Sequence, residues 1–589
     1  MPANTQPTRI FDLLEVISCR PAGQVMFTSV NNGEWRDYTI SDYRNYADRT
    51  SYALLNFGIS KGEPIVSITQ NRAEFNFVDM GILQVGAVHV PLYPAIDDEK
   101  LTKILLETRS RIVFVSNRYL FLKISNLCKN LDFIEHIFTF DIVPGAMNYY
   151  DLLKIGKENQ DPDTLLAVKA SVTPDDLASI IYISGAATEA KGVMLTHKNH
   201  TLTVLHYAEL FNFTTGTRTI SILPLAHSYE RTSNYALQYL GIPVYYSEGL
   251  KTIFEEIQIV KPGILFAVPL MLEKMYSSLV QKTLPVNNLL QIVYRSFIRM
   301  ALNMGPKNEN KWWKHLWQKL ADKFVFTKWR EFLGDELSVI MCGGAALPKQ
   351  MYNLYKSAGI QIYEGYGITE AGPIVTVNKE NLHRAYTSGC PINGVSIKIA
   401  DDGELLVKSD GVMQGYYKKP QDTSAVIDKD GWLHTGDKGS IDEKGFLSIT
   451  GIMKDIFKLS SGLYVNPIPI EEHFCKSSYF RNVWVSGHNR NFLSAIIVPD
   501  LNFIVSAHQG LMENPADYNA LLKQAEIETI ISNEVKKYNS GFRGSDQVVK
   551  YIVIAEEWST ENKFLKSDGT LNRQALTNKY DANLDKLYR

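Results

Sequence analysis

Short apolar runs alternate with amphipathic stretches through the first two-thirds of the chain. Residues 64–70, 87–93 and 111–116 (PIVSITQ, AVHVPLY and RIVFVS) are mostly apolar and rich in β-branched residues, which is typical of buried strands. The stretches that follow them, AEFNFVDMGILQVG, DEKLTKILLETR and LFLKISNLCKN, have helical character. This alternation predicts an α/β fold with parallel sheets, in which loops at the strand ends are available for ligands.

The pattern changes at about residue 385. From there to Gly451, short strands alternate with Gly/Asp turns, as in VSIKIADDGELLVKSDG and DEKGFLSITG, which predicts a β-rich subdomain. Beyond Gly451, the run LSAIIVP and the helical stretch LLKQAEIETIISNEVKKYN indicate a small α/β unit. We therefore expect a large N-terminal region, residues 1–451, with its β-rich part at about 385–451, and a C-terminal α/β domain, residues 452–589.

Composition narrows the function classes. The 589 residues include 61 basic and 63 acidic side chains, so nothing indicates a nucleic-acid partner. The five cysteines show no CxxC spacing, which argues against a zinc site or a disulfide framework and favours a reducing, cytoplasmic compartment. The longest apolar stretch, residues 80–96, contains a histidine and two prolines, so we expect a buried helix and strand rather than a membrane span.

The segment YISGAATEAKGVMLTHKN has the layout of a phosphate-binding loop. A strand-like run leads into a Ser-Gly pair at 184–185, and a Lys-Gly pair at 191–192 returns the chain to an apolar run. Loops of this kind hold nucleotide phosphates with backbone amides, hydroxyls and a lysine. Residues 186–188 read Ala-Ala-Thr, so much of that chemistry is missing from the middle of the loop.

Six further stretches follow the loop in a fixed order. They are ILPLAHSYERT (222–232), FAVPLMLEKMY (266–276), MCGGAALP (341–348), YEGYGITEAGP (363–373), GWLHTGD (431–437) and GIMKDIFKLSSGLYVNPIPIE (451–471). With the loop, they make the chain resemble the AMP-forming acyl-adenylating superfamily, in particular the long-chain fatty acyl-CoA synthetases, from about residue 10 to about residue 580. In that family a fatty acid and ATP give an acyl-adenylate and pyrophosphate, and coenzyme A then displaces AMP. A small C-terminal domain rotates between the two steps.

The resemblance implies a site for ATP or AMP, Mg²⁺ and coenzyme A. Thr369 matches a residue that contacts the α-phosphate, and Glu370 matches the carboxylate that holds Mg²⁺, a metal suited to hard oxygen ligands. Asp437 matches the carboxylate that accepts both ribose hydroxyls, and Lys454 occupies the hinge position. The other positions expected at the nucleotide are Ser184, Gly185, Lys191, Gly192, Gly344, Ala345, Glu364, Tyr366 and Gly367. Taken singly, each also fits a β-turn or an ordinary surface position.

The phosphate loop departs from the family pattern, which reads Thr-Ser-Gly-Thr-Thr-Gly, a variable residue, then Pro-Lys-Gly. Ala186 and Ala187 stand where two hydroxyl donors are expected, and Ile183 and Ala190 also differ from the pattern. Thr188 replaces a glycine, and its Cβ would cost about 1–2 kcal/mol in a left-handed conformation. The loop is therefore expected to grip a triphosphate poorly.

Several cationic positions are lost as well. They are Leu270 and Ile452, where arginines are expected, Leu463, where a basic residue is expected, and Thr570, where the adenylation lysine is expected. Removing one preorganised donor typically costs about 2.7–4 kcal/mol, and enzymes supply roughly 8–23 kcal/mol in total. We therefore expect adenylation to be weak or lost. The alternative is that backbone amides, Lys191 and Lys566 still bind Mg-ATP in a rearranged way.

The stretch ILPLAHSYERT bears on the acyl chain. In the long-chain class this region gates an acyl tunnel, so the resemblance implies that His227 and Tyr229 lie at the tunnel mouth. A satisfied core histidine and a packing tyrosine are the alternative.

Residues 311–330 form an amphipathic segment if written as a helix. One face carries Trp313, Leu316, Trp317, Leu320 and Phe324, and the other carries Lys311, His315, Gln318 and Asp322. This pattern fits an interfacial helix in peripheral contact with the inner face of a membrane. It also fits an amphipathic helix that packs on its own domain.

Three functional hypotheses remain open. The chain is a long-chain fatty acid–CoA ligase with an eroded site, or a pseudo-ligase that binds a long-chain fatty acid or acyl-adenylate. The third hypothesis keeps only the thioester-forming half-reaction, which in this family does not need the lysine missing at position 570.

Overall fold

The computed structural model describes residues 6–588 except 32, 130, 185–189, 211–215, 250, 305–311, 454–456, 460–463, 489, 508–520, 523, 543–545 and 567. The chain forms two compact units. The larger contains Met1–Lys398, Leu406–Thr435 and Ile441–Ser448, and the smaller contains Ile399–Leu405, Gly436–Ser440 and Ile449–Arg589. Each unit is described by itself.

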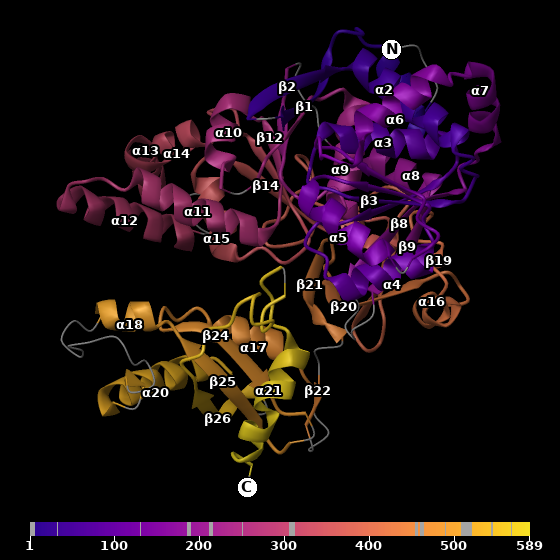
Figure 1. Cartoon of the computed structure of the whole chain (residues 1–589). Helices are drawn as coiled ribbons and strands as arrows, with labels where there is room; N and C mark the ends of the chain where they lie inside the picture. Colours follow the sequence, from indigo (N-terminus) through magenta and orange to yellow (C-terminus); the bar gives the residue numbers. More distant parts are fainter. Residues whose placement is uncertain are drawn as a thin grey trace. The chain divides into compact units, whose positions relative to one another are not determined.

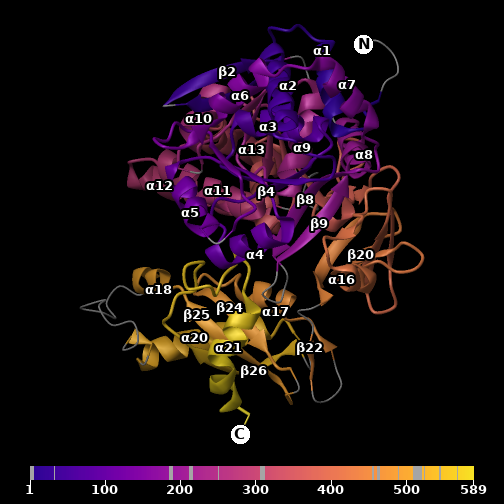
Figure 2. The same ribbon diagram turned by 45° about the vertical axis from the view of Figure 1, so that its right-hand side comes forward.

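One sheet of the larger unit has eight strands in the order β19-β9-β8-β4-β3-β5-β6-β7. Its strands are β3 (Pro64–Ile68), β4 (Val88–Leu92), β5 (Ile112–Val115), β6 (His136–Thr139), β7 (Met147–Asn148), β8 (Leu177–Ser184), β9 (Ala190–Thr196) and β19 (Gly415–Tyr416). Pairing is parallel from β8 to β7, whereas β9 is antiparallel to both β8 and β19. Figure 2 shows β8 and β9 side by side in this sheet.

The second sheet has nine strands in the order β16-β15-β14-β13-β12-β10-β11-β1-β2. Its strands are β1 (Val25–Asn31), β2 (Glu34–Thr39), β10 (Thr219–Ser221), β11 (Val244–Tyr246), β12 (Ile264–Ala267), β13 (Val339–Cys342), β14 (Gln361–Tyr366), β15 (Thr376–Val377) and β16 (Cys390–Pro391). The central strands β14, β13, β12, β10, β11 and β1 run parallel. Their carboxyl ends therefore lie along one edge of the sheet.

Helices connect and cover these strands (Figure 1). They are α1 (Leu13–Ser18), α2 (Ile40–Asn56), α3 (Ala73–Gln84), α4 (Asp98–Thr108), α5 (Arg118–Cys128), α6 (Tyr149–Glu158), α7 (Pro162–Ser171), α8 (His197–Ala208), α9 (Ser228–Leu240), α10 (Ile253–Val260), α11 (Pro269–Thr283), α12 (Asn288–Asn303), α13 (Trp312–Ala321), α14 (Thr327–Phe332), α15 (Lys349–Ser357) and α16 (Pro420–Val426). Short helical turns are η1 (Ile10–Asp12), η3 (Asp322–Phe326) and η4 (Thr369–Ala371).

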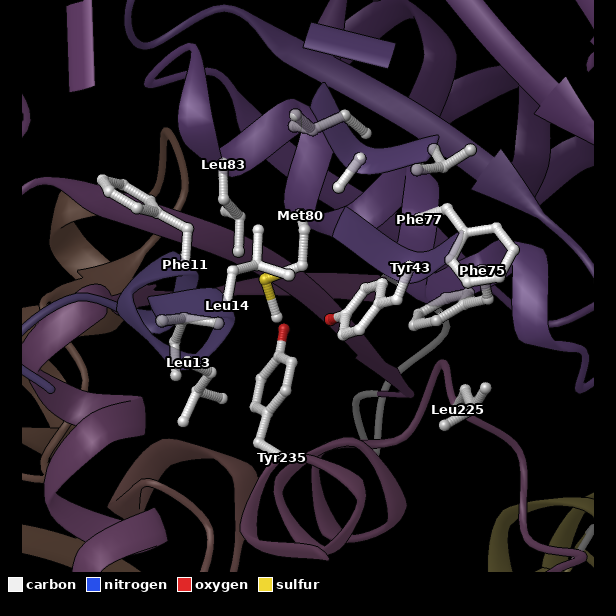
Figure 3. Packing of buried hydrophobic residues seen from close by; sticks show 14 of the residues in the cluster. Phe11, Leu13, Leu14, Tyr43, Phe75, Phe77, Met80, Leu83, Leu225 and Tyr235 are labelled. Atoms are coloured by element: carbon white, nitrogen blue, oxygen red, sulfur yellow. The ribbon is translucent and has the colours of Figure 1, made fainter. Parts of the chain in front are cut away.

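The core of the larger unit forms around α3, all of whose residues are buried. Phe77 and Met80 of this helix pack with Tyr43 of α2 and Tyr235 of α9 (Figure 3). Gly81 lets α2 approach closely, because a Cβ there would lie 2.5 Å from the Cβ of Thr50. The predicted helix at residues 73–86 is thus buried on every side, which explains its almost continuous apolar sequence.

The β-rich segment forms a four-stranded sheet of β17 (Ser396–Ile399), β18 (Glu404–Lys408), β20 (Leu433–Ile441) and β21 (Leu447–Ile452). The smaller unit contains the sheet β24-β25-β26, whose strands are Phe480–Ser486, Leu493–Pro499 and Val548–Val553. Its other elements are β22 (Phe457–Lys458), β23 (Tyr464–Val465), α17 (Pro467–Phe474), α18 (Leu501–Ala507), α20 (Ala525–Asn539) and α21 (Arg573–Asp585). The predicted α/β fold class is confirmed.

No helix within the described ranges combines the length and apolar character needed to cross a membrane.

Candidate functional site

Four loops of the larger unit follow the parallel strands β10, β12, β13 and β14, and each contains residues singled out from the sequence. Because these strands are parallel neighbours, the loops share the carboxyl edge of the sheet, where α/β folds commonly bind ligands. His227, Leu270, Gly344 and Thr369 each lie in or next to one of these loops. The fold therefore collects four stretches that are far apart in sequence.

The segment after β14 is fixed by close backbone packing. Gly367 accepts no side chain, because a Cβ there would overlap the carbonyl oxygen of Pro373. Thr369 then begins the short helix η4, and its hydroxyl lies 2.8 Å from the hydroxyl of Ser228 at the start of α9. Ser228 was not among the predicted site residues, although it lies next to His227 and Tyr229 in the chain.

Glu370 has a partner from a distant part of the sequence. The hydroxyl of Tyr416 in β19 donates a hydrogen bond of 2.8 Å to the Glu370 carboxylate. Burial, reinforced by the negative charge of Glu370, raises the pKa of Tyr416, so the phenol stays protonated and acts as a donor. Glu370 is half-buried and retains a second carboxylate oxygen. One acidic group and the Thr369 hydroxyl are hard oxygen ligands, which suit Mg²⁺ when phosphate oxygens complete its shell.

Lys191 also lies next to Tyr416. Its ammonium is 4.8 Å from the centre of the Tyr416 ring and 2.9 Å from a carboxylate oxygen of Asp422. The side chains of Lys191 and Asp422 are 29% and 41% exposed, so this ion pair is worth about 0.2–1 kcal/mol. A phosphate group could therefore displace Asp422 at little cost. Tyr416 and Asp422 belong to GYYKKPQD, a stretch that was not used in the sequence-based prediction.

The predicted phosphate loop falls between β8 and β9, which pair antiparallel. Ser184 pairs with Ala190 and Ile183 with Lys191 at the ends of the two strands. Gly185 and positions 186–188 lie outside the described residues, so the conformation expected for Thr188 is not tested. Gly192 packs against the neighbouring strand, since a Cβ there would lie 2.7 Å from a methyl group of Ile180.

The region predicted for the acyl chain surrounds the loop after β13. Tyr229 donates a hydrogen bond of 3.1 Å to the carbonyl oxygen of Met341 and lies 3.5 Å from the Cβ position of Gly343. Gly344 has a positive φ of 81°, which favours glycine, and both Gly344 and Ala345 are exposed. His227 is exposed as well.

Two carboxyl groups near these loops have raised pKa values. Burial raises the pKa of Glu230 to about 8, although Ser221 donates a 2.5 Å hydrogen bond to it. Burial also raises the pKa of Glu364 to about 7, against the lowering effect of backbone amides from Leu347 and Tyr386. At neutral pH Glu230 is therefore mostly protonated, whereas Glu364 is only partly protonated.

A buried polar network anchors α9. Asp79 lies 2.6 Å from His89 and 2.5 Å from Arg231, and it accepts a 2.6 Å hydrogen bond from Tyr235. The Arg231 guanidinium and the His89 ring hold the pKa of Asp79 at about 2, despite its complete burial. Ser67 and His89 lie 2.7 Å apart, so the set resembles a Ser-His-Asp nucleophile arrangement. Since Ser67, His89 and Asp79 are at most 2% exposed, substrate cannot reach them, and their role is structural.

The smaller unit contains a second group of predicted positions. Asp437 is half-buried in β20. Thr570 is exposed, and its hydroxyl donates a 2.7 Å hydrogen bond to Asp568. The backbone N–H of Lys566 donates to the carbonyl of Thr570 at 2.8 Å, which makes the two residues neighbours across a tight hairpin. Positions 454 and 463, predicted as hinge and charge-loss sites, lie outside the described residues, as does the side chain of residue 452.

The described residues do not form a metal site by themselves. They contain no group of three or more His, Cys, Asp or Glu side chains that could hold a metal. A Mg²⁺ ion at Glu370 would therefore depend on the phosphate oxygens of its nucleotide for most of its ligands.

Comparisons with known proteins cover nearly the whole chain. The model for the AMP-binding enzyme family matches residues 18–417, and the model for the AMP-binding enzyme C-terminal domain matches residues 454–589. The chain is 26% identical over 571 residues to the long-chain-fatty-acid–CoA ligase FadD15 of Mycobacterium bovis, covering 96% of this chain and 94% of that protein. It is 27% identical over 592 residues to the long-chain-fatty-acid–CoA ligase 5 of Mus musculus, covering 94% and 84%.

The fold is also similar to that of solved structures. The crystal structure of the anthranilate CoA ligase AuaEII in complex with anthranoyl-AMP superimposes with a TM-score of 0.72 and 18% identity, covering 100% of this chain and 98% of that one. The same architecture therefore extends over the full length of both proteins.

Proposed function

Because the chain belongs to the AMP-binding enzyme family, we propose that it is a long-chain fatty acid–CoA ligase homologue whose adenylation step is weak or lost. The complete reaction would join a fatty acid and ATP into an acyl-adenylate with release of pyrophosphate. The coenzyme A thiolate would then attack the acyl carbon, and the bond to the AMP oxygen would break. The observation that carries the proposal is Thr570, whose hydroxyl is bonded to Asp568 where the family places a lysine.

A long-chain acyl group is supported as the substrate by the curated relatives, which are named long-chain-fatty-acid–CoA ligases. Tyr229 and the exposed loop at Gly344 and Ala345 are the residues we assign to the acyl side of the site. The division of the chain into domains at 451 and 452 stays a prediction.

Nucleotide binding is supported by the groups that remain. Thr369 and Glu370 can hold the α-phosphate side of a Mg-nucleotide, and Lys191 is a cation that a phosphate can take over from Asp422. Mg²⁺ would supply charge neutralisation between phosphate oxygens. The residues expected to hold the β- and γ-phosphates are fewer, since Ala186 and Ala187 carry no hydroxyl. We therefore propose that the protein still binds AMP or acyl-adenylate but catalyses the reaction of ATP with a fatty acid poorly.

Retention of the thioester-forming step is the second candidate. That step needs no cation at position 570, so the substitution that disables adenylation leaves it possible. A pure binder of acyl-adenylate is the remaining alternative.

One experiment with purified full-length protein separates these functions. The protein is incubated with palmitate, Mg-ATP and coenzyme A, and in parallel with preformed palmitoyl-AMP and coenzyme A. We expect weak or no palmitoyl-CoA formation in the first mixture. Product only in the second mixture indicates the half-enzyme, and product in neither, together with palmitoyl-AMP binding by calorimetry, indicates the binder. Rapid product formation in the first mixture contradicts the proposal.

A further inference from the structure

Helix α12 presents an apolar surface to solvent. Its inner side packs through the buried residues Tyr294, Ile298 and Ala301. On the outer side Leu289 is 71% exposed and Ile292 is 64% exposed. The other exposed apolar residues of this surface are Leu290, Val293, Met300 and, just before the helix, Val286. In Figure 1 and Figure 2 the helix lies at the periphery of the larger unit. We call this set of six residues the α12 face.

The segment that carries the α12 face is basic, and the acidic Asp322 of the neighbouring η3 is paired with Arg330. Residues 274–308 contain five lysines and arginines and no aspartate or glutamate. Arg295 and Arg299 are exposed on α12, and neither forms an ion pair with any residue in the described part of the chain. An apolar helix surface bordered by unpaired cations is complementary to an apolar layer with an anionic border.

The neighbouring turn η3 extends the same surface. Phe324 is 45% exposed, and its ring stacks on Phe297 of α12 with centroids 6.3 Å apart. Leu320, just before η3, is also exposed, and the exposed Lys319 and Lys323 flank it. The surface therefore combines apolar and basic groups over more than one element.

The exposed apolar surface differs from the face predicted for residues 311–330. Trp317, predicted on the interfacial face of residues 311–330, is only 7% exposed and belongs to the core of the larger unit. The side chains of residues 312–316 lie outside the described set. Leu320 and Phe324, on the same predicted face, are exposed, but most of the exposed apolar surface belongs to α12, which precedes the predicted segment.

We propose that the α12 face docks on the anionic surface of a lipid bilayer, with its apolar side chains at the boundary between headgroups and acyl chains. Charge decides between occupants: a second copy of this face would bring cations against cations, whereas anionic lipid headgroups supply the missing counter-charge. The benefit of docking rests on the proposed function, because a long-chain acyl substrate partitions into bilayers and a docked protein would lie close to it. Binding to lipid itself requires neither ATP nor acyl substrate.

The test is co-sedimentation of the full-length protein with vesicles. Phosphatidylcholine vesicles are compared with vesicles that also contain about one third phosphatidylglycerol. We expect binding to the anionic vesicles and little binding to the neutral ones, with binding weakened by salt. The Arg295→Gln/Arg299→Gln variant should bind roughly fivefold more weakly for each cation removed. The Leu289→Ser/Ile292→Ser variant should also lose at least about tenfold, because it removes the apolar contribution.

Matched controls keep the experiment specific. Ile142→Ser alters an 80% exposed apolar residue elsewhere, and Arg118→Gln/Lys157→Gln removes two exposed cations elsewhere. All variants change exposed side chains, so their melting temperatures should match that of the wild type. Wild-type binding that is equal on both vesicle types, absent on both, or unchanged in both α12 variants overturns the proposal.

Self-association is measured in the same samples by light scattering without lipid. A dimer that the Leu289→Ser/Ile292→Ser variant dissociates would show that a second copy covers the face, and this outcome also overturns the proposal. Vesicle binding is scored without substrate, so the absence of any acyl chemistry would refute the proposed function and leave the lipid result intact.

Discussion

Replacing Thr570 by lysine tests directly whether the missing cation limits adenylation. Thr570 lies in a hairpin closed by two backbone hydrogen bonds, from Lys566 N–H to the Thr570 carbonyl at 2.8 Å and from Gly569 N–H to the Lys566 carbonyl at 2.9 Å. A new side chain at 570 disturbs neither bond. The lost hydroxyl contact with Asp568 is exposed, so its removal costs at most about 0.5–1.5 kcal/mol. We therefore expect Thr570→Lys to fold normally.

The expected gain in adenylation rate follows from the transition-state stabilisation that one preorganised charge provides. A group aimed at charge that develops in the transition state contributes about 2.7–4 kcal/mol, or roughly 10²–10³ in rate. Palmitate-dependent exchange between ATP and labelled pyrophosphate measures the adenylation step alone. Thr570→Lys should raise this exchange by that factor, whereas Thr570→Met, of similar length and without charge, should not.

Lys566 offers the result that would refute this reasoning. Residues opposite each other in an antiparallel pair have Cβ atoms about 4.5–5.5 Å apart on one face, so Lys566 and Thr570 point to the same side of the hairpin. If Lys566 already supplies the charge, the wild type shows robust exchange, Lys566→Gln abolishes it and Thr570→Lys adds little. That pattern would show a relocated lysine in place of a lost one.

Three further predictions concern the larger unit. Gly367→Ala should lower the free energy of unfolding by about 2 kcal/mol or more, because the new Cβ would overlap a backbone carbonyl. The control Gly23→Ala, which has open space around it, should leave the free energy of unfolding unchanged, and thermal unfolding compares the two variants. Asp422→Asn frees Lys191 and should tighten ATP binding up to about fivefold in calorimetry at low salt, an effect that high salt should reduce. Because the folded pKa of Glu230, about 8, exceeds its unfolded value, stability should fall as pH rises from about 5 to 8. Glu230→Gln should flatten this part of the melting-temperature profile, and an unchanged slope would exclude Glu230 as its source.

Much of the fold could be predicted because its strands and helices leave local patterns. The run RIVFVS became β5, and the stretch at 73–86 became α3, within a few residues at each end. The two-residue strand β19 could not be found this way, since Gly415 and Tyr416 show no periodicity. Gly415 and Tyr416 are recognised as a strand of the first sheet only because they pair with the backbone of β9.

Residues of the candidate site could be predicted where they belong to a sequence motif. Thr369 and Glu370 stand in such a motif, but their partners Ser228 and Tyr416 come from other parts of the chain. Hydrogen bonds between distant residues depend on how sheets and loops fold together, and a single sequence contains no periodic trace of them. The pairing of Lys191 with Asp422 was missed for the same reason.

The retained glycines of the motifs have structural reasons to persist. Gly192 leaves room for Ile180, and Gly367 leaves room for the Pro373 carbonyl, so each would be kept to maintain packing whether or not a nucleotide binds. Arg231 likewise neutralises the buried Asp79, and removing one partner of such a pair is strongly destabilising. By contrast, the loss of the cation expected at position 570 costs little folding energy, because Thr570 is exposed. Retention of these glycines and of Arg231 is therefore evidence for the fold. The positions expected to face phosphate, such as exposed Thr570, are the ones whose identity informs on catalysis.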